Sequence, residues 1–507
     1  MNDTQFQQKY SQLVSELKKV SLFGSCGSIL GWDEQANMPP KGGEHRANQL
    51  SLLAGMGHQM STSTELGELI GELESLKSFD DLEEPQAVVI SEARREYDRA
   101  TKLPQALVEE MSKVTSLGQQ AWVEARKEKD FSTFQPWLEK IVGLKREEAE
   151  AIGYEGGQPY DALLDAYEPG ASTQEIDAVF SAFRTPLVEL LQQITDSSVK
   201  TDADLLERSY PVAQQKEFAL EAAAAIGFDF DAGRLDIAAH PFCSGIGPGD
   251  CRLTTRYDEH HFPGAFFGTL HEAGHGIYEQ GLDPAWYGTA IGESASLGIH
   301  ESQSRMWENL VGRSQSFWQH FYSRAQHYFP TALSDVSQQQ FHLAINDVRP
   351  TFIRVEADEV TYNLHIMLRF EMEQLLISGE LAPADVPAVW DQKFTESFGI
   401  TPPDVSQGCL QDVHWGHGLI GYFPTYALGN MYASQIYNQA EKELGDLGAM
   451  FSQGEFLPLK KWLNEKIHKN GRRYKANRLV EVVTGESLSY EPLLAHLRNR
   501  FSPLYNL

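Results

Sequence analysis

Apolar residues recur at helical spacing along most of the 507-residue chain. Several segments combine this spacing with Leu, Ala, Glu, Gln and Lys, and Gly or Pro usually stands at their ends, as expected of helices. The segments predicted to be helical are 104–128, 173–196, 213–226, 351–377 and 425–444. The start of the chain repeats the pattern and has no apolar core or cleavage site, so we expect folded protein there and no signal peptide. Its apolar positions are Phe6, Tyr10, Leu13, Leu17 and Val20.

Alternation of apolar and polar residues, which is typical of strands, is rare in this sequence. The best strand candidate is 251–257, a Thr- and Tyr-rich segment with alternating character. No internal repeat, low-complexity tract or Pro/Ser-rich linker interrupts the helical pattern. We therefore predict a mostly α fold in which residues 1–507 form a single large helical unit with a small β element. A chain of this length can also fold as two lobes around a groove, although the sequence shows no boundary.

Composition narrows the range of partners. The formal net charge is -29, from 71 acidic and 42 basic residues, which disfavours binding to nucleic acid and to anionic membranes. No stretch approaches the roughly 18 apolar residues of a membrane span. The four cysteines are scattered and form no C-x-x-C pair, which argues against a thiolate metal site and fits a reducing compartment. We therefore expect a cytoplasmic protein.

The strongest chemical signal is an H-E-x-x-H motif, HEAGH at 271–275. On a helix, His271 and His275 share one face and can hold a zinc ion, and Glu272 can reach a water bound to that ion. Pro263 suits the first turn of such a helix and Gly281 suits its C-cap. Zinc would lower the pKa of the water to about 7, and Glu272 would take its proton and deliver it to the leaving amine. The alternative is a chance motif on a solvated helix.

A catalytic zinc site needs a third protein ligand and an open position. Two downstream glutamates compete for this role: Glu293, 18 residues after His275, and Glu301, 26 residues after it. Glu301 begins a predicted helix that runs to Gly312, whereas Glu293 sits beside a glycine. The helix favours Glu301, but the chemistry of the two residues does not decide between them.

Further motifs accompany H-E-x-x-H in a fixed order. They are HPF at 240–242, DxRxT at 250–254, HES at 300–302, IRxxADE at 353–359 and GxxQDxHW at 408–415. Similar segments continue outward to GWDEQ at 31–35 and YFPTY at 422–426. With these motifs, the chain resembles the M32 metallocarboxypeptidases, also called the thermostable carboxypeptidase Taq family, over essentially its whole length.

This resemblance implies that Glu301 is the third metal ligand. It also implies a mostly helical fold with a deep active-site groove, a homodimer, and removal of single residues from the C-termini of peptides. Broad specificity with poor release of proline is typical of the family, and Co²⁺ can often replace Zn²⁺ in it. Peptides with a free C-terminus are therefore the expected substrates.

A carboxypeptidase must recognise the free carboxylate of its substrate, and arginine suits this role because its fork matches a carboxylate. The leading candidate is Arg354, predicted to lie on a helix after Pro350. Asp358, Thr361 and His365 would follow it on the same polar face. An intrahelical salt bridge from Arg354 to Asp358 is the alternative interpretation.

Arg252 is the second candidate for the carboxylate, and its alternative is an ion pair with Asp250 that shapes a hairpin. His240, His414 and Tyr422 are candidates for hydrogen bonds to the substrate or the oxyanion, although single His and Tyr residues are more often satisfied core residues.

Four more residues in the motifs have predicted roles. Asp358 or Glu359 could bind a ligand imidazole from behind and fix its tautomer. Trp32 and Trp415 are expected in the core and not as platforms for substrate.

Other functions remain open at this point. A zinc endopeptidase or oligopeptidase would share the metal chemistry but would need no group that binds a terminal carboxylate. A non-catalytic helical scaffold has no use for the general base Glu272, which disfavours it. An aminopeptidase is less favoured, because no acidic cluster for an N-terminal amine stands out.

Overall fold

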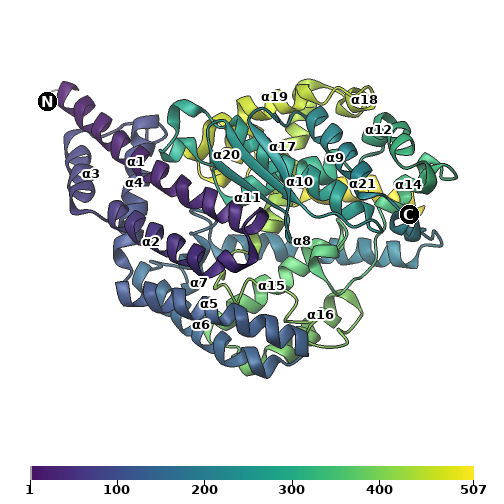
Figure 1. Cartoon of the computed structure of the whole chain (residues 1–507), viewed down its shortest axis with the longest axis horizontal. Coiled ribbons are helices and arrows are strands. Elements are labelled where there is room, and N and C mark those ends of the chain that lie inside the picture. The colour runs from purple at the N-terminus through teal and green to yellow at the C-terminus, as the bar shows by residue number, and fades with distance from the viewer. Residues whose placement is uncertain (1–2) are drawn as a thin grey trace. The chain divides into compact units, whose positions relative to one another are not determined.

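The computed structural model describes residues 3–507 and divides them into two compact units. Unit 1 comprises the described residues up to 101 together with 202–345 and 436–487, and unit 2 comprises 102–201, 346–435 and 488–507. The chain is 70% helical with a small three-stranded sheet, so the predicted mostly α class is confirmed (Figure 1). No helix within residues 3–507 combines the length and the apolar character needed to cross a membrane.

Unit 1 holds the sheet and most of the helices. Its helices and strands are α1 (Asp3–Ala36), α2 (Gly43–Ser61), α3 (Thr64–Leu76), α4 (Pro85–Lys102), α9 (Val212–Ile226), β1 (Gly233–Ile237), β2 (Phe242–Gly247), β3 (Asp250–Thr255), α10 (Phe262–Gly281), α11 (Leu297–Arg305), the π-helix η5 (Met306–Val311), α12 (Gln315–Tyr328), α13 (Pro330–Leu333), α14 (Gln338–Ile345), α18 (Leu447–Ser452), α19 (Leu457–Lys466) and α20 (Ala476–Thr484). Short 3₁₀ turns connect them at η1 (Pro40–Gly42), η2 (Ala203–Glu207), η3 (Pro284–Trp286), η4 (Ala290–Gly292) and η8 (His468–Arg473).

Unit 2 is helical throughout its regular structure. Its elements are α5 (Gln105–Glu128), α6 (Phe131–Ile152), α7 (Pro159–Leu164), α8 (Thr173–Asp196), η6 (Arg354–Glu356), α15 (Thr361–Ser378), η7 (Pro383–Asp385), α16 (Val386–Phe398) and α21 (Glu491–Tyr505). Helix α17 (Pro424–Leu444) begins in unit 2 and ends in unit 1. Helices α5 and α6 run side by side (Figure 1).

Four of the five predicted helical segments are present within a residue or two of their expected bounds, as α5, α8, α9 and α17. The prediction of one helix over 351–377 is wrong in its first ten residues. There the chain forms only the short turn η6, and α15 begins at Thr361. Asp358 explains this start, because its carboxylate accepts hydrogen bonds from the backbone N–H groups of Val360 and Thr361 and so caps the helix.

The sheet has the strand order β1-β3-β2. The central strand β3 is the predicted strand at 251–257, shifted to Asp250–Thr255. It pairs in parallel with β1 and antiparallel with β2, so Arg252 lies opposite Arg234 on one side and Ser244 on the other. The sheet packs against α10, the helix that carries the H-E-x-x-H motif.

Aromatic side chains fix α10 within unit 1. Phe262 and Phe266 are fully buried on one face of the helix. Phe266 stacks on Phe218 of α9 with ring centroids 4.9 Å apart and lies 5.3 Å from the ring of Trp318 on α12. Burial of each such side chain contributes about 1.5–3 kcal/mol. The motif helix is therefore held by apolar packing on the face that its polar motif residues leave free.

Candidate active site

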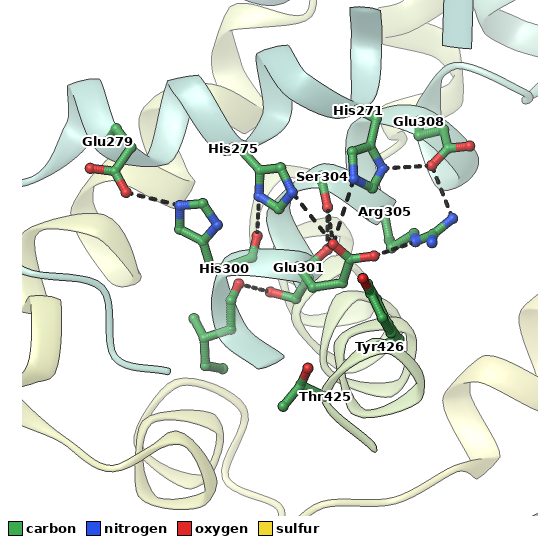
Figure 2. A network of polar contacts seen from close by, with 12 residues as sticks. His271, His275, Glu279, His300, Glu301, Ser304, Arg305, Glu308, Thr425 and Tyr426 are labelled. Carbon is green, nitrogen blue, oxygen red and sulfur yellow. Dashed lines mark hydrogen bonds and ion pairs between the residues drawn. The ribbon is translucent and has the colours of Figure 1, made fainter. Parts of the chain in front are cut away.

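The H-E-x-x-H motif lies within α10 and brings two imidazoles next to a carboxylate (Figure 2). The ring centroids of His271 and His275 are 4.8 Å apart. Oε2 of Glu301, from α11, lies 3.6 Å from Nε2 of His271 and 3.4 Å from Nε2 of His275. Within residues 3–507, these three side chains form the group whose His, Cys or carboxylate ligand atoms all lie within 4.8 Å of one another.

A glycine inside the motif allows this close approach of α10 to α11. A Cβ atom at Gly274 would lie 2.6 Å from both the carbonyl oxygen of Gln303 and Cα of Ser304. Any other residue at this position would force the two helices apart, and with them the imidazoles and Glu301. The second variable position of the motif is thus constrained by helix packing.

Helix α11 begins four residues before Glu301, and not at Glu301 as the sequence predicted. Ser296 is its N-cap, because its Oγ accepts a hydrogen bond from the N–H of Ile299 at 3.0 Å. Glu301 therefore lies one full turn inside the helix, where its backbone is fixed. The helix continues after Arg305 as the π-helix η5.

Each imidazole has a partner on the nitrogen that faces away from Glu301. Nδ1 of His271 lies 2.8 Å from Oε2 of Glu308, and Nδ1 of His275 lies 3.1 Å from the carbonyl oxygen of His300. A carboxylate and a carbonyl can only accept hydrogen bonds, so both Nδ1 atoms carry the proton. The two Nε2 atoms then both face the Glu301 carboxylate, an arrangement that suits a bound cation.

Burial and charge shift the pKa values of these groups. Burial opposes ionisation of Glu301, but Arg305 and the two imidazoles outweigh it and hold the pKa of Glu301 well below its usual range. Burial lowers the pKa of His275 to about 3. It also lowers that of His271, but Glu301 and Glu308 outweigh burial and raise the pKa of His271 to about 9. The carboxylates therefore attract positive charge to this cluster.

Glu272, the residue between the two histidines, is 6% exposed. Burial is the largest influence on its carboxyl group and raises its pKa to about 7. A buried carboxylate with such a pKa is suited to accept a proton near neutral pH.

Glu293, the alternative third ligand, forms an ion pair at another place in unit 1. Its carboxylate pairs with Arg472 at 2.8 Å and its side chain is 48% exposed. It does not belong to the group formed by the two imidazoles and Glu301.

Asp358 and Glu359 do not have the predicted role behind an imidazole. Asp358 caps α15, and Glu359 pairs with His496 and Arg500. Both carboxylates are thus used in the structure of unit 2, and the partners of the imidazoles are Glu308 and the backbone of His300.

Two of the predicted substrate-binding residues, Arg252 and His240, lie in unit 1. Arg252 makes a two-pronged ion pair with Asp250, with both hydrogen bonds at 2.8 Å, which is the arrangement of the structural alternative. Its guanidinium also lies 4.3 Å from the ring of Trp32, which is buried as predicted. The side chain of His240 is exposed.

Arg354 lies in unit 2, buried in an ionic cluster that it shares with Arg369 and Asp412. Nε and Nη2 of Arg354 donate to Oδ1 of Asp412 at 3.0 and 2.8 Å, and Nε of Arg369 donates to Oδ2 at 2.6 Å. Arg354 does not lie on the predicted long helix, because it precedes α15, and the alternative interpretation, an intrahelical salt bridge with Asp358, is wrong for the same reason. Two guanidinium groups thus share one carboxylate, and the cluster keeps a surplus positive charge.

His414 and Tyr422 lie beside this cluster in unit 2. Nε2 of His414 is 3.3 Å from the hydroxyl of Tyr426, and its ring lies 5.5 Å from that of Tyr422. Burial lowers the pKa of His414 to about 3, so the ring is neutral at pH 7. Trp415 is buried, as predicted, and donates a hydrogen bond to Glu373 at 3.0 Å.

Comparison with known proteins decides the family. Residues 12–501 match the model of the carboxypeptidase Taq (M32) metallopeptidases. The chain is 45% identical to thermostable carboxypeptidase 1 of Thermus thermophilus, over 98% of this chain and 99% of that protein, and 41% identical to carboxypeptidase 1 of Bacillus subtilis, over 97% of each. A crystal structure of an M32 carboxypeptidase from Deinococcus radiodurans matches with a TM-score of 0.94 at 37% identity, covering 99% of this chain and 100% of that one.

The chain belongs to the M32 metallopeptidase family.

This M32 enzyme is a metallocarboxypeptidase, a hydrolase that acts on peptide C-termini. Its residues fit the metal that the family requires. Two imidazole nitrogens and one carboxylate oxygen are the donor set of many catalytic zinc sites, and a metal bound here would displace the proton from Nε2 of His271. Both imidazoles have the tautomer that metal binding needs, and Arg305 holds the second oxygen of Glu301 at 2.6 Å.

Several residues of the M32 enzyme that make contacts in these clusters were not predicted from the sequence. Glu308 and Arg305 follow the HES motif on the same helical segment, so their spacing from Glu301 was an available signal. Arg369 and Glu373 stand in a stretch of α15 that is otherwise nearly all buried and largely apolar. Charged residues in such a stretch indicate a buried ion pair or hydrogen-bond network.

Proposed function

We propose that the M32 enzyme is zinc-dependent, with His271, His275 and Glu301 as the protein ligands. The observation that carries this proposal is the convergence of three ligand atoms within 4.8 Å, with the opposite nitrogen of each imidazole already engaged. A zinc ion held there would polarise the scissile carbonyl and lower the pKa of a bound water. Co²⁺ prefers similar ligands and is proposed as a substitute.

Glu272 is the proposed general base of the reaction. It takes a proton from the attacking water and delivers it to the leaving amine. Support comes from its position in the motif between the two histidines, and from burial, which raises its pKa to about 7.

The terminal carboxylate of the substrate is proposed to bind Arg354. Support comes from charge, because Arg354 and Arg369 share a single partner in Asp412 and an anion would balance the surplus. Arg252 is the alternative, and its pairing with Asp250 makes it less available. His240, His414 and Tyr422 are proposed to hydrogen-bond the substrate or the oxyanion.

The remaining proposals rest on the family. The substrates are peptides with a free C-terminus, taken with broad specificity and with poor release of proline, whose bond to the preceding residue has no N–H. We further propose a cytoplasmic homodimer, with residues 1–507 as a single catalytic domain that contains a deep active-site groove.

The test is hydrolysis of matched peptides that end in a carboxylate or an amide, followed by mass spectrometry. Stepwise loss of single C-terminal residues from the acid is expected, with little reaction on the amide. Removal of metal with a chelator should abolish the reaction, and Zn²⁺ or Co²⁺ should restore it. Equal cleavage of both peptides at internal bonds would instead indicate the rival endopeptidase.

A further inference from the structure

The two proposed ligand imidazoles differ in the charge of the groups that hold them. Nδ1 of His275 faces a neutral backbone carbonyl, that of His300, whereas Nδ1 of His271 faces the carboxylate of Glu308 at 2.8 Å (Figure 2). A carboxylate behind an imidazole fixes its tautomer and increases the electron density at the other nitrogen, whereas a carbonyl does mainly the first. The two histidines are thus unequal as metal donors.

The backbone that presents Glu308 is unusual. The α-helical pattern of α11 gives way after Arg305 to the π-helix η5, Met306–Val311, and π-helical turns are rare and frequently lie at functional sites. Gly312 follows this turn, and a Cβ atom there would lie 2.7 Å from Cδ1 of Leu270 on α10. Close packing against the residue before His271 therefore accompanies the irregular turn that carries Glu308.

Two arginines hold the Glu308 carboxylate in place. Nη1 of Arg305 lies 3.1 Å from Oε2 of Glu308, and Nη2 of Arg313 lies 3.7 Å from Oε1. Arg305 also donates to Oε1 of Glu301. The positive charges allow Glu308 to stay ionised although its side chain is only 13% exposed.

These contacts close a ring. His271 contacts Glu308, Glu308 contacts Arg305, Arg305 contacts Glu301, and Oε2 of Glu301 returns to within 3.6 Å of His271. Each member is fixed by two neighbours, so the position of the His271 ring depends on Glu308. His275 has no charged group at its Nδ1, and its ring instead stacks on that of His300 with centroids 4.3 Å apart.

We propose that Glu308 is a positioning residue for metal binding, which holds His271 in the required tautomer and makes it the stronger imidazole donor. The proposal rests on the assignment of His271 as a ligand. It goes beyond that assignment by stating that a residue outside the ligand set controls how tightly the metal is held.

The test compares Glu308→Gln with the matched control Glu293→Gln. The amide of Gln can still accept a hydrogen bond from Nδ1, so this change removes the charge and keeps the shape. The readout is the dissociation constant of Zn²⁺, measured on the full-length protein by competition with a chromophoric chelator. We expect Glu308→Gln to bind zinc about 10–100-fold more weakly than the wild type, and Glu293→Gln to be unchanged.

Glu308→Asp provides a second variant, which keeps the charge with a shorter reach, and we expect its zinc affinity to lie between those of Glu308→Gln and the wild type. Wild-type zinc affinity in both Glu308 variants would overturn the proposal, and so would an equal loss in Glu293→Gln. His271→Ala distinguishes failure of the ligand assignment from failure of the positioning role of Glu308. If His271→Ala binds zinc normally, the ligand assignment itself fails; if it loses zinc while Glu308→Gln does not, only the positioning role fails.

Discussion

The two units each bury an ionic cluster, and the two clusters differ in composition and in their balance of charge. In unit 1, Glu301 and Glu308 face two imidazoles, and Arg305 and Arg313 balance the charge of the two carboxylates. In unit 2, Arg354 and Arg369 share Asp412 and keep a positive charge. Buried charges are costly unless they are paired, so the surplus charge of the second cluster favours an anion, whereas the converging donor atoms of the first favour a metal ion. We propose that the first cluster binds a divalent metal and that the second binds the terminal carboxylate of the substrate, the two groups that a metallocarboxypeptidase must bind.

The largest effect is expected for Glu272→Gln, which distinguishes proton transfer from metal binding in unit 1. Glu272→Gln should keep its zinc, because Glu272 is not a proposed ligand, and should lose about 10³-fold in kcat, because the amide cannot accept a proton. The measurement is zinc content together with kcat on a peptide with a free C-terminus. Substantial turnover by a fully zinc-loaded Glu272→Gln would mean that another group is the base.

The unit 2 cluster can be broken through its shared carboxylate. Asp412→Asn leaves two buried guanidinium groups without a counterion, so we expect a loss of about 3–5 kcal/mol in the free energy of unfolding. Urea unfolding, followed by tryptophan fluorescence, measures this. Asp404→Asn is the matched control in the same unit, since its partner Lys129 is 58% exposed and their ion pair should contribute less than about 1 kcal/mol. Similar unfolding midpoints for the two variants would contradict the importance of the cluster.

Arg354→Ala tests whether the positive charge of the unit 2 cluster binds the terminal carboxylate of the substrate. A charge-assisted hydrogen bond contributes about 1.5–3 kcal/mol, so kcat/KM should fall about ten- to a hundredfold on peptides with a free carboxylate. Little change is expected on the matched amides, and Arg354→Lys should restore activity only in part, because an ammonium cannot make the forked contact. An equal proportional loss on acid and amide would show that Arg354 supports the fold, and Arg252→Ala would then be compared in the same way.

The smallest effect is expected for a substitution at the start of α11, which changes the helix that carries Glu301 and leaves the charges of the unit 1 cluster unchanged. Ser296→Ala removes the N-cap of α11, the helix that carries Glu301, and should cost about 1 kcal/mol of stability. Zinc affinity should change much less than in Glu308→Gln, because the contacts of the ligands remain. Thermal unfolding and the chelator competition measure the two quantities. A zinc affinity reduced as strongly as that of Glu308→Gln would show that the helix start, and not the ring of ionic contacts, determines metal binding.

The two clusters also differ in how far sequence could predict them. His271, Glu272 and His275 lie within one turn of a helix, so their geometry follows from helical periodicity alone. Glu301 comes from the next α-helix in the chain; the predicted helix favoured it over Glu293, and the family resemblance then implied that it is the third ligand. For Arg354, helical periodicity suggested a partner four residues away, whereas its partner Asp412 is 58 residues away.

The predicted helix start at residue 351 was wrong and Glu308 was missed for a similar reason, since both depend on contacts that helical periodicity does not describe. Asp358 begins α15 by capping it, and this local hydrogen bonding overrides the helical propensity of the preceding residues. Glu308 contacts His271 from a π-helical turn, and the periodicity of the sequence does not predict such a turn. Periodicity thus predicts the elements, but the contacts between distant segments depend on tertiary packing.

The most direct test of the account is the zinc content of Glu301→Ala and Glu293→Ala, measured by elemental analysis after purification under identical conditions. Both substitutions remove a glutamate from unit 1, but only Glu301 lies within 3.6 Å of the two imidazoles. We predict that Glu301→Ala loses its zinc and its activity, whereas Glu293→Ala keeps its zinc. Full zinc in Glu301→Ala and none in Glu293→Ala would contradict the proposed metal site.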